Sequence, residues 1–170
     1  GLVMSNVLWV LELAGNHRGS VDRAKAIIDA HSEVCAKHGV KAAFKLQFRQ
    51  LDSLIHPAFR GTDTKHIKRF EETAMSGEQF AKVVSHIRKS GHLVAATPFD
   101  EGSLEWIEEF DVDILKVASC SIDDWPLVER IRHVNRMVGA STAGASRETL
   151  QRFVAAMRAE GRDFALMHCV

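Results

Sequence analysis

The sequence predicts an α/β protein of the TIM (β/α)8-barrel type, of which this chain carries about the first six strands. Short apolar runs alternate with amphipathic helical segments along the chain, which is typical of a parallel sheet with helices outside it. The runs are continuously apolar, as in strands buried on both faces. With strand ends at Leu13 and His168, five βα units average about 31 residues, the repeat of an eightfold barrel of about 250 residues.

Six apolar runs are the expected strands. In chain order they cover Val7–Leu13, Lys41–Phe48, His92–Thr97, Asp113–Ala118, Met137–Ser141 and Phe164–Cys169. An open flavodoxin-like sheet is the structural alternative for a chain of this length, but the sequence has no glycine-rich dinucleotide fingerprint to support it.

The segments between the runs carry helix start and stop signals. Four polar residues can cap helices that follow them: Ser20, Ser76, Asp124 and Ser146. Gly39 ends the first of these helices, and Gln79 completes a capping box at the second. Short helices are also expected at His66–Thr73 and Glu101–Phe110.

Composition narrows the function classes. The chain has 170 residues, 46% of them apolar and 26% charged, with 22 basic and 22 acidic side chains. A net charge of zero argues against a nucleic-acid-binding protein and against a polybasic membrane module. No apolar run approaches the roughly 18 residues of a membrane span, and no signal peptide is expected. The three cysteines predict reduced thiols in a cytoplasmic protein.

Polar residues collect where the expected strands end, which is where parallel α/β folds place their active sites. They are Glu12, Asn16, His17, Lys45, Gln47, Thr97, Lys116, Ser119, Ser141 and His168, with the aromatic Phe99 beside them. Lys45 and Lys116 lie in or beside apolar runs, although lysine is rarely buried unpaired. Two cations with hydroxyl donors predict a site for a small anion such as a phosphorylated carboxylate, and Glu12 could serve as a base or hold a substrate hydroxyl.

A structural interpretation of these residues stays open. A single lysine at a strand end is as often solvated or salt-bridged as it is part of a site. On one helix face, His31, Cys35 and His38 have a spacing that could bind zinc, but they share an apolar stripe, so packing or surface roles are the favoured interpretation.

Six segments, in order, resemble the N-acetylneuraminate (sialic acid) synthase family, and within it the branch of spore-coat polysaccharide biosynthesis proteins. The opening segment runs from Glu12 to Ser20. The others are Lys45-Leu46-Gln47, Ala96-Thr97-Pro98-Phe99-Asp100, Lys116-Val117-Ala118-Ser119, Ser141-Thr142 and Leu166-Met167-His168-Cys169-Val170. The resemblance covers nearly the whole chain, and six ordered motifs are far more specific than one.

The resemblance implies a reaction in surface polysaccharide biosynthesis. Phosphoenolpyruvate condenses with the open-chain aldehyde of an N-acylated amino sugar to give a sialic-type (nonulosonic) acid and phosphate. The residues implied to hold phosphoenolpyruvate are Lys45, Thr97, Lys116, Ser119 and Ser141, whereas Glu12 and Gln47 would face the sugar. Asn16, His17, Phe99 and His168 are expected beside the substrates. Glu12, Lys45 and Lys116 are the expected catalytic residues.

The resemblance also implies a divalent metal, manganese or magnesium, and a homodimer. The family's metal-binding histidines lie on the last two strands, so no metal ligand is expected in this chain. Residues 1–170 are expected to be the N-terminal portion of the barrel, without the last two βα units and any C-terminal antifreeze-like domain. Such a piece of a longer protein is not expected to be active alone.

Two departures from the family pattern bear on the chemistry. Ser121 stands where family members commonly carry a glutamate that handles the attacking water. The fifth-strand motif reads Ser141-Thr142-Ala143-Gly144 instead of Ser-Thr-Gly-Met. Two alternatives therefore stay open: a class I aldolase with Lys45 or Lys116 as a Schiff-base nucleophile, and a degenerate, non-catalytic barrel that binds anions.

Overall fold

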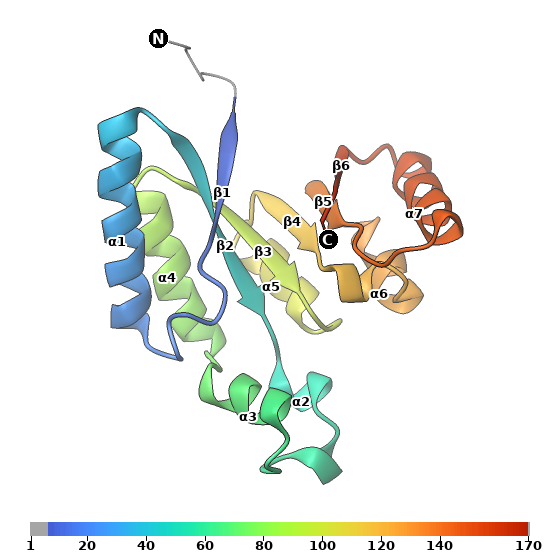
Figure 1. Cartoon of the computed structure of the whole chain (residues 1–170), viewed down its shortest axis with the longest axis horizontal. Helices are drawn as coiled ribbons and strands as arrows, with labels where there is room; N and C mark the ends of the chain where they lie inside the picture. The colour runs from blue at the N-terminus through green and yellow to red at the C-terminus, as the bar shows by residue number, and fades with distance from the viewer. Residues whose placement is uncertain (1–6, 170) are drawn as a thin grey trace.

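The computed structural model describes residues 7–169 and forms a curled half-barrel of parallel strands (Figure 1). The six strands follow one another in sheet order exactly as they do in the chain, and every neighbouring pair is parallel. They are β1 (Leu8–Glu12), β2 (Lys41–Phe48), β3 (Leu93–Pro98), β4 (Ile114–Val117), β5 (Met137–Ser141) and β6 (Phe164–Met167). The sequential order confirms the βα-barrel architecture and excludes the flavodoxin-like alternative, whose strand order is permuted.

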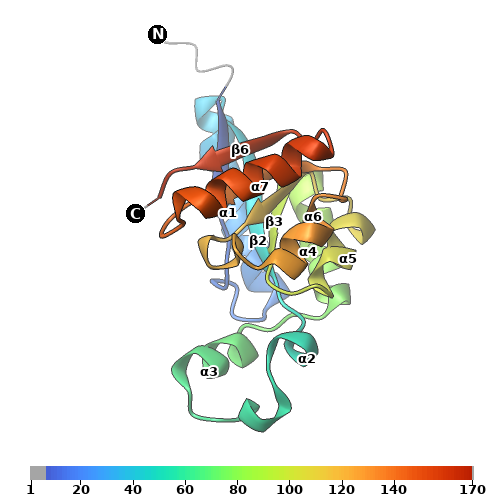
Figure 2. The same ribbon diagram turned by 90° about the vertical axis from the view of Figure 1, so that its right-hand side faces the viewer.

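Helices connect the strands. The long ones are α1 (Val21–His38), α4 (Gly77–Lys89) and α7 (Arg147–Ala159), and the shorter ones are α5 (Ser103–Glu109) and α6 (Trp125–Ile131). Helices α1 and α4 lie side by side against one part of the sheet (Figure 1). The excursion after β2 contains α2 (Leu51–Leu54), the 3₁₀ turn η1 (Pro57–Phe59) and α3 (Lys65–Glu72), and it lies beyond the carboxyl ends of the strands (Figure 2).

The four predicted caps are present. The hydroxyls of Ser20 and Ser146 each accept a hydrogen bond from the backbone N–H three residues on, and Asp124 does the same with a carboxylate oxygen. Ser76 and Gln79 form a reciprocal capping box, with distances of 3.2 and 2.9 Å. These contacts satisfy N–H groups that a helix leaves without an internal partner.

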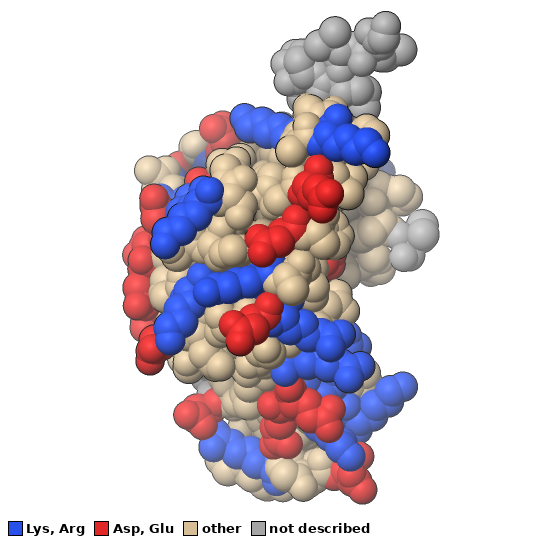
Figure 3. Space-filling view, turned by 90° about the vertical axis from the view of Figure 1, so that its left-hand side faces the viewer, with Lys and Arg blue, Asp and Glu red and all other residues tan. Residues whose placement is uncertain are grey.

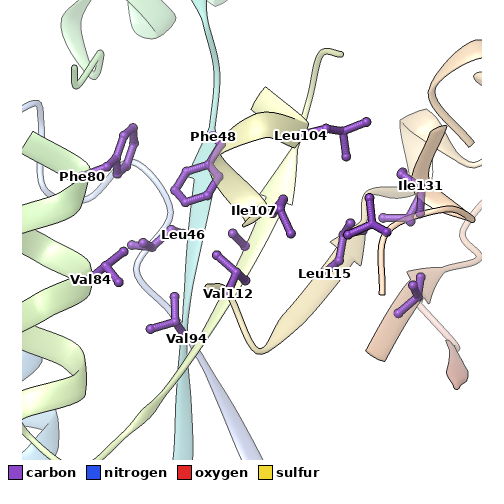
Figure 4. Packing of buried hydrophobic residues seen from close by; sticks show 14 of the residues in the cluster. Leu46, Phe48, Phe80, Val84, Val94, Leu104, Ile107, Val112, Leu115 and Ile131 are labelled. Carbon is purple, nitrogen blue, oxygen red and sulfur yellow. The ribbon is translucent and has the colours of Figure 1, made fainter. Parts of the chain in front are cut away.

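The core lies between the sheet and its helices. Phe48 and Leu46 on β2 pack toward Phe80 and Val84 on α4, as Figure 4 shows. Phe48 is fully buried and has three aromatic neighbours, with ring centroids 5.0 Å away for Phe80 and 5.6 Å away for Trp106. This packing fixes the course of β2, the strand that carries Lys45 and Gln47.

Several predicted boundaries were wrong by one or two residues. The strand expected at Val7–Leu13 begins and ends one residue inside that range, and the strand expected at Phe164–Cys169 ends at Met167. The helix expected at Glu101–Phe110 begins only at Ser103, because the Asp100 carboxylate accepts hydrogen bonds from both the N–H and the hydroxyl of Ser103, which makes a turn of the two residues between them.

The two edge strands of the described sheet, β1 and β6, expose apolar side chains. Trp9 and Val10 on β1 are about half exposed, as are Leu166 and Met167 on β6. Exposed apolar edges of this kind are typical of a sheet that continues. Within the described residues no helix is long and apolar enough to cross a membrane.

Candidate functional site

Three neighbouring strands place polar groups around the Lys45 ammonium. Its Nζ lies 2.9 Å from the Glu12 carboxylate on β1 and donates to the Thr97 hydroxyl on β3 at 3.4 Å. The strand register accounts for both contacts. Glu12 is the β-ladder partner of Lys45, and Thr97 is the partner of Gln47, which lies two residues after Lys45 on β2. Thr97 is buried, whereas the Glu12 side chain is 48% exposed, so this cluster reaches from the sheet interior to solvent.

Lys116 on β4 enters the same region from the other side. It is buried, and its Nζ donates hydrogen bonds to the Val117 carbonyl at 3.2 Å and to the Ser141 hydroxyl on β5. Its partner in the β4–β5 ladder is Gly139, where an added Cβ would lie only 3.4 Å from the Lys116 side chain. The lysine stem therefore packs against β5 at Gly139.

The charges of the two lysines are coupled. Burial lowers the pKa of Lys116, the Lys45 ammonium lowers it further, and Cys169 and Glu12 act in the opposite direction. Within residues 7–169 Lys116 forms no ion pair, and Lys45 forms one, to Glu12. Two ammonium groups thus lie near a single carboxylate, and one of them is buried, so an added anion would be stabilised there.

Cys169 lies at the same place, and the sequence analysis gave it no role. A hydrogen bond with the Ser141 hydroxyl lowers the pKa of the Cys169 thiol, with further lowering from the backbone of Ala143 and Thr142 and from the Lys116 charge. Groups that stabilise a thiolate would also stabilise an oxyanion placed at this end of β5. The signal in the sequence was the position of Cys169 two residues after Met167, the last residue of β6, because strand residues two apart lie on the same face.

Arg49 was also missed. It follows Lys45 and Gln47 at a spacing of two residues, which places all three on one face if β2 geometry continues. Its guanidinium lies between the rings of Phe70 and Phe99, 4.4 and 4.2 Å from their centroids. Burial lowers the pKa of Arg49, and its Nε is buried without a hydrogen-bond partner. The two-residue spacing from Lys45 and Gln47 was the signal in the sequence that could have identified Arg49.

Within residues 7–169, no hydrogen bond or ion pair joins the other predicted residues to either lysine. His17 is buried against Phe80, and its Nδ1 accepts the Gly19 N–H at 2.9 Å, which places it in the packing between the first loop and α4. Phe99 contacts Arg49, and Asn16 uses its backbone carbonyl to accept from Arg23. Gln47 is half buried, Ser119 lies in the short 3₁₀ turn η2 (Ser119–Ser121), and His168 is exposed.

Ser121, at the position of the family's glutamate, is buried, and its hydroxyl lies 3.8 Å from the Cys120 sulfur. Among residues 7–169 no group of three or more His, Cys, Asp or Glu side chains is arranged to hold a metal ion. His31 illustrates this, because its Nδ1 bonds the Ile27 carbonyl of its own helix.

The fold and the cluster define a class, the parallel βα-barrel proteins with cationic side chains gathered at the carboxyl ends of the strands. Residues 32–170 match the NeuB family. The chain belongs to this family, which confirms the resemblance seen in its motifs.

Relatives of the chain carry synthase and spore-coat names. N-acetylneuraminate-9-phosphate synthase of Drosophila melanogaster is 27% identical, over all of this chain and 47% of its own length. Spore coat polysaccharide biosynthesis protein SpsE of Bacillus subtilis is 29% identical, over 96% of this chain and 44% of its own.

A crystal structure from Chromobacterium violaceum, of a protein assigned to spore coat polysaccharide biosynthesis, superposes with a TM-score of 0.93. It is 45% identical, over 96% of this chain and 49% of its own. The chain thus spans about half the length of the relatives it matches.

Proposed function

We propose that the protein catalyses a phosphoenolpyruvate-dependent condensation with the open-chain aldehyde of an N-acylated amino sugar, which yields a sialic-type acid and phosphate. One observation carries the proposal: in a NeuB-family chain, Lys45, Lys116 and the Thr97 and Ser141 hydroxyls surround one region at the carboxyl ends of the strands. Relatives named as synthases and spore-coat proteins support a role in surface polysaccharide synthesis.

The lysines bind the carboxylate and phosphate of phosphoenolpyruvate. Each ammonium has three donors, and Lys116 uses two of them on Val117 and Ser141, which leaves one for the ligand. Because Lys116 is dehydrated, its charge acts with less screening than a surface lysine. The Ser119 and Ser141 hydroxyls complete this binding site.

The carbon–carbon bond forms between C3 of phosphoenolpyruvate and the aldehyde carbon, whose oxygen takes up a proton. Water adds to C2 and gives up a proton, and phosphate leaves with the bridging oxygen as the C2–O bond breaks. Glu12 and Gln47 face the sugar, and the Glu12 carboxylate, held 2.9 Å from Lys45, accepts hydrogen bonds from sugar hydroxyl or amide groups.

A divalent cation belongs to the proposed enzyme, but the residues described here do not form a site for it. No step above depends on a metal. Ser121 is buried beside Cys120, so the handling of the attacking water is not assigned to it.

The test is phosphate release from phosphoenolpyruvate by the full-length protein, with manganese and N-acetylmannosamine or related N-acylated sugars. We expect release that requires both substrates, that is lost in Lys116→Met and that persists in Lys41→Met, a lysine at the opposite end of β2. Absence of release with every aldehyde sugar would contradict the proposal. Binding of phosphoenolpyruvate without any turnover would favour a non-catalytic barrel. This alternative is considered because Ser121 stands where family members commonly carry a glutamate.

A class I aldolase is the second candidate. Burial and a neighbouring ammonium lower the pKa of Lys116, and the same two causes activate lysines that form Schiff bases. Borohydride reduction in the presence of pyruvate or an aldehyde sugar separates the two functions. A covalent lysine adduct detected by mass spectrometry would favour the aldolase, since the condensation above needs no imine.

A further inference from the structure

A second cationic region lies between the loop that follows β1 and the end of α3. It is a cavity of about 670 Å³ that Arg18, Arg23 and Arg69 line together with Asn16, Glu72 and Thr73. The volume falls within the range of about 300–1,000 Å³ for small-molecule pockets. Its lining includes neither Lys45 nor Lys116, so it is separate from the lysine cluster.

Close backbone contacts hold the two walls of this cavity together. Gly19 has a φ of +72°, and an added Cβ there would lie 3.0 Å from the Ala74 carbonyl just beyond α3. An added Cβ at Gly15 would lie 3.4 Å from the Thr73 side chain, an ordinary packing contact. The Arg23 Nε donates to the Asn16 carbonyl at 2.8 Å, which fixes that side chain along the loop. Arg18 therefore projects from the loop, Arg23 from the first turn of α1 and Arg69 from α3, and these contacts hold the loop against the end of α3.

The three guanidinium groups are not neutralised by the protein. Among the described residues none of Arg18, Arg23 and Arg69 lies within 4 Å of a carboxylate, and Arg18 and Arg69 donate no side-chain hydrogen bond. Glu72 lines the same cavity without pairing with any of them. The surplus charge reaches beyond the cavity, because Arg69 contributes to lowering the pKa of Arg49.

On the face that Figure 3 shows, several Lys and Arg side chains lie across the lower part, with Asp and Glu side chains among them. Like charges brought together without partners repel one another, and an arginine fork is suited to the oxygens of a phosphate group. With Glu72 counted against them, the three guanidinium groups leave two positive charges. That surplus matches a phosphate monoester, which carries a charge of about −1.5 to −2 at pH 7.

We propose that this cavity binds the phosphate-monoester group of a ligand, at a site distinct from the lysine cluster. Two sources can supply that group: a phosphate on the acceptor sugar, in which case the site selects a phosphosugar substrate, or a separate phosphorylated molecule. The binding site itself does not depend on the proposed function. The assignment of the phosphate to the acceptor does.

The test uses methyl phosphate as a minimal probe and isothermal titration calorimetry as the readout. Lys116→Met serves as the background, because it weakens anion binding at the lysine cluster. In that background Arg69→Gln should weaken methyl phosphate binding about tenfold or more, the loss of one charge-assisted hydrogen bond. Arg69→Lys should lose less, since it keeps the charge but not the fork.

Lys65→Gln is the matched control, because it removes one positive charge from an exposed position of the same helix outside the cavity lining. We expect it to leave methyl phosphate binding unchanged. Equal affinity in the background protein, Arg69→Gln and Arg18→Gln would overturn the proposal. So would an equal loss in Lys65→Gln, which would show that only the overall charge matters.

Turnover with N-acetylmannosamine and its 6-phosphate distinguishes the two sources. If the acceptor carries the phosphate, Arg69→Gln raises the KM of the phosphorylated sugar about tenfold and leaves that of the free sugar unchanged. If a separate molecule carries it, neither KM changes while methyl phosphate binding still falls. Failure of turnover with every sugar would end the proposed function and leave the calorimetric result standing, because that result reports binding alone.

Discussion

Replacing Lys116 with methionine removes one charge and keeps most of the side-chain volume. In the structure this lysine is buried, has no ion pair among the described residues and has a lowered pKa, chiefly because of burial. Two of its three donors already bond Val117 and Ser141. One charge-assisted hydrogen bond to phosphoenolpyruvate is therefore lost, together with the unscreened attraction of the charge.

A loss of about 2–3 kcal/mol follows from that count, which corresponds to phosphoenolpyruvate binding about 30- to 150-fold more weakly. The same substitution should raise the free energy of unfolding, because a lowered lysine pKa means that folding disfavours the charged form. The substitution should therefore weaken ligand binding and raise stability, which is the pattern expected when a buried charge serves function at a cost in stability.

Calorimetric titration with phosphoenolpyruvate and urea unfolding measure the two effects. Lys41→Met, an exposed lysine at the amino end of β2, is the control, and should leave affinity unchanged and stability within about 0.5 kcal/mol. A Lys116→Met protein that is less stable and binds the ligand as well as the wild type would refute the reasoning, since Lys116 would then be a structural residue.

Three further predictions follow from the same contacts. Affinity for phosphoenolpyruvate should fall as pH rises through the lowered pKa of Lys116, and Lys45→Met should move that loss to higher pH, as a pH series of titrations would show. Burial lowers the pKa of His17 from its usual 6.5, so stability should be full above about pH 6.5 and decline below it as the unfolded chain takes up the proton; His17→Gln should flatten that part of the urea-midpoint profile. Phe48→Ala should cost about 3–5 kcal/mol by urea unfolding, whereas a cost below about 1 kcal/mol would show that the aromatic cluster around Phe48 is not a packed core.

The spacing of apolar residues and the helix-capping residues predicted most of this fold. The strands at Lys41–Phe48 and Met137–Ser141 have the predicted bounds, and most residues of each run are buried. The excursion after β2 was less predictable. Its helix α3 (Lys65–Glu72) lies one residue before the predicted His66–Thr73, whereas the short α2 and the 3₁₀ turn η1 were not predicted.

The part of the candidate site whose side chains are positioned by the strands alone was predictable from the sequence. Lys45, Thr97, Lys116 and Ser141 come together because parallel strands in sequential order bring their carboxyl ends to one edge. His17 could not be placed in this way, since its loop turns back and packs the ring against Phe80. Loop residues depend on tertiary contacts that a strand pattern does not contain.

The most direct measurement of the central claim is a crystal structure of the protein with phosphoenolpyruvate. The account predicts ligand oxygens within hydrogen-bond distance of both the Lys45 and the Lys116 ammonium groups, with the Thr97 and Ser141 hydroxyls beside them. Ligand bound elsewhere, with nothing bridging the two lysines at saturating concentration, would contradict it.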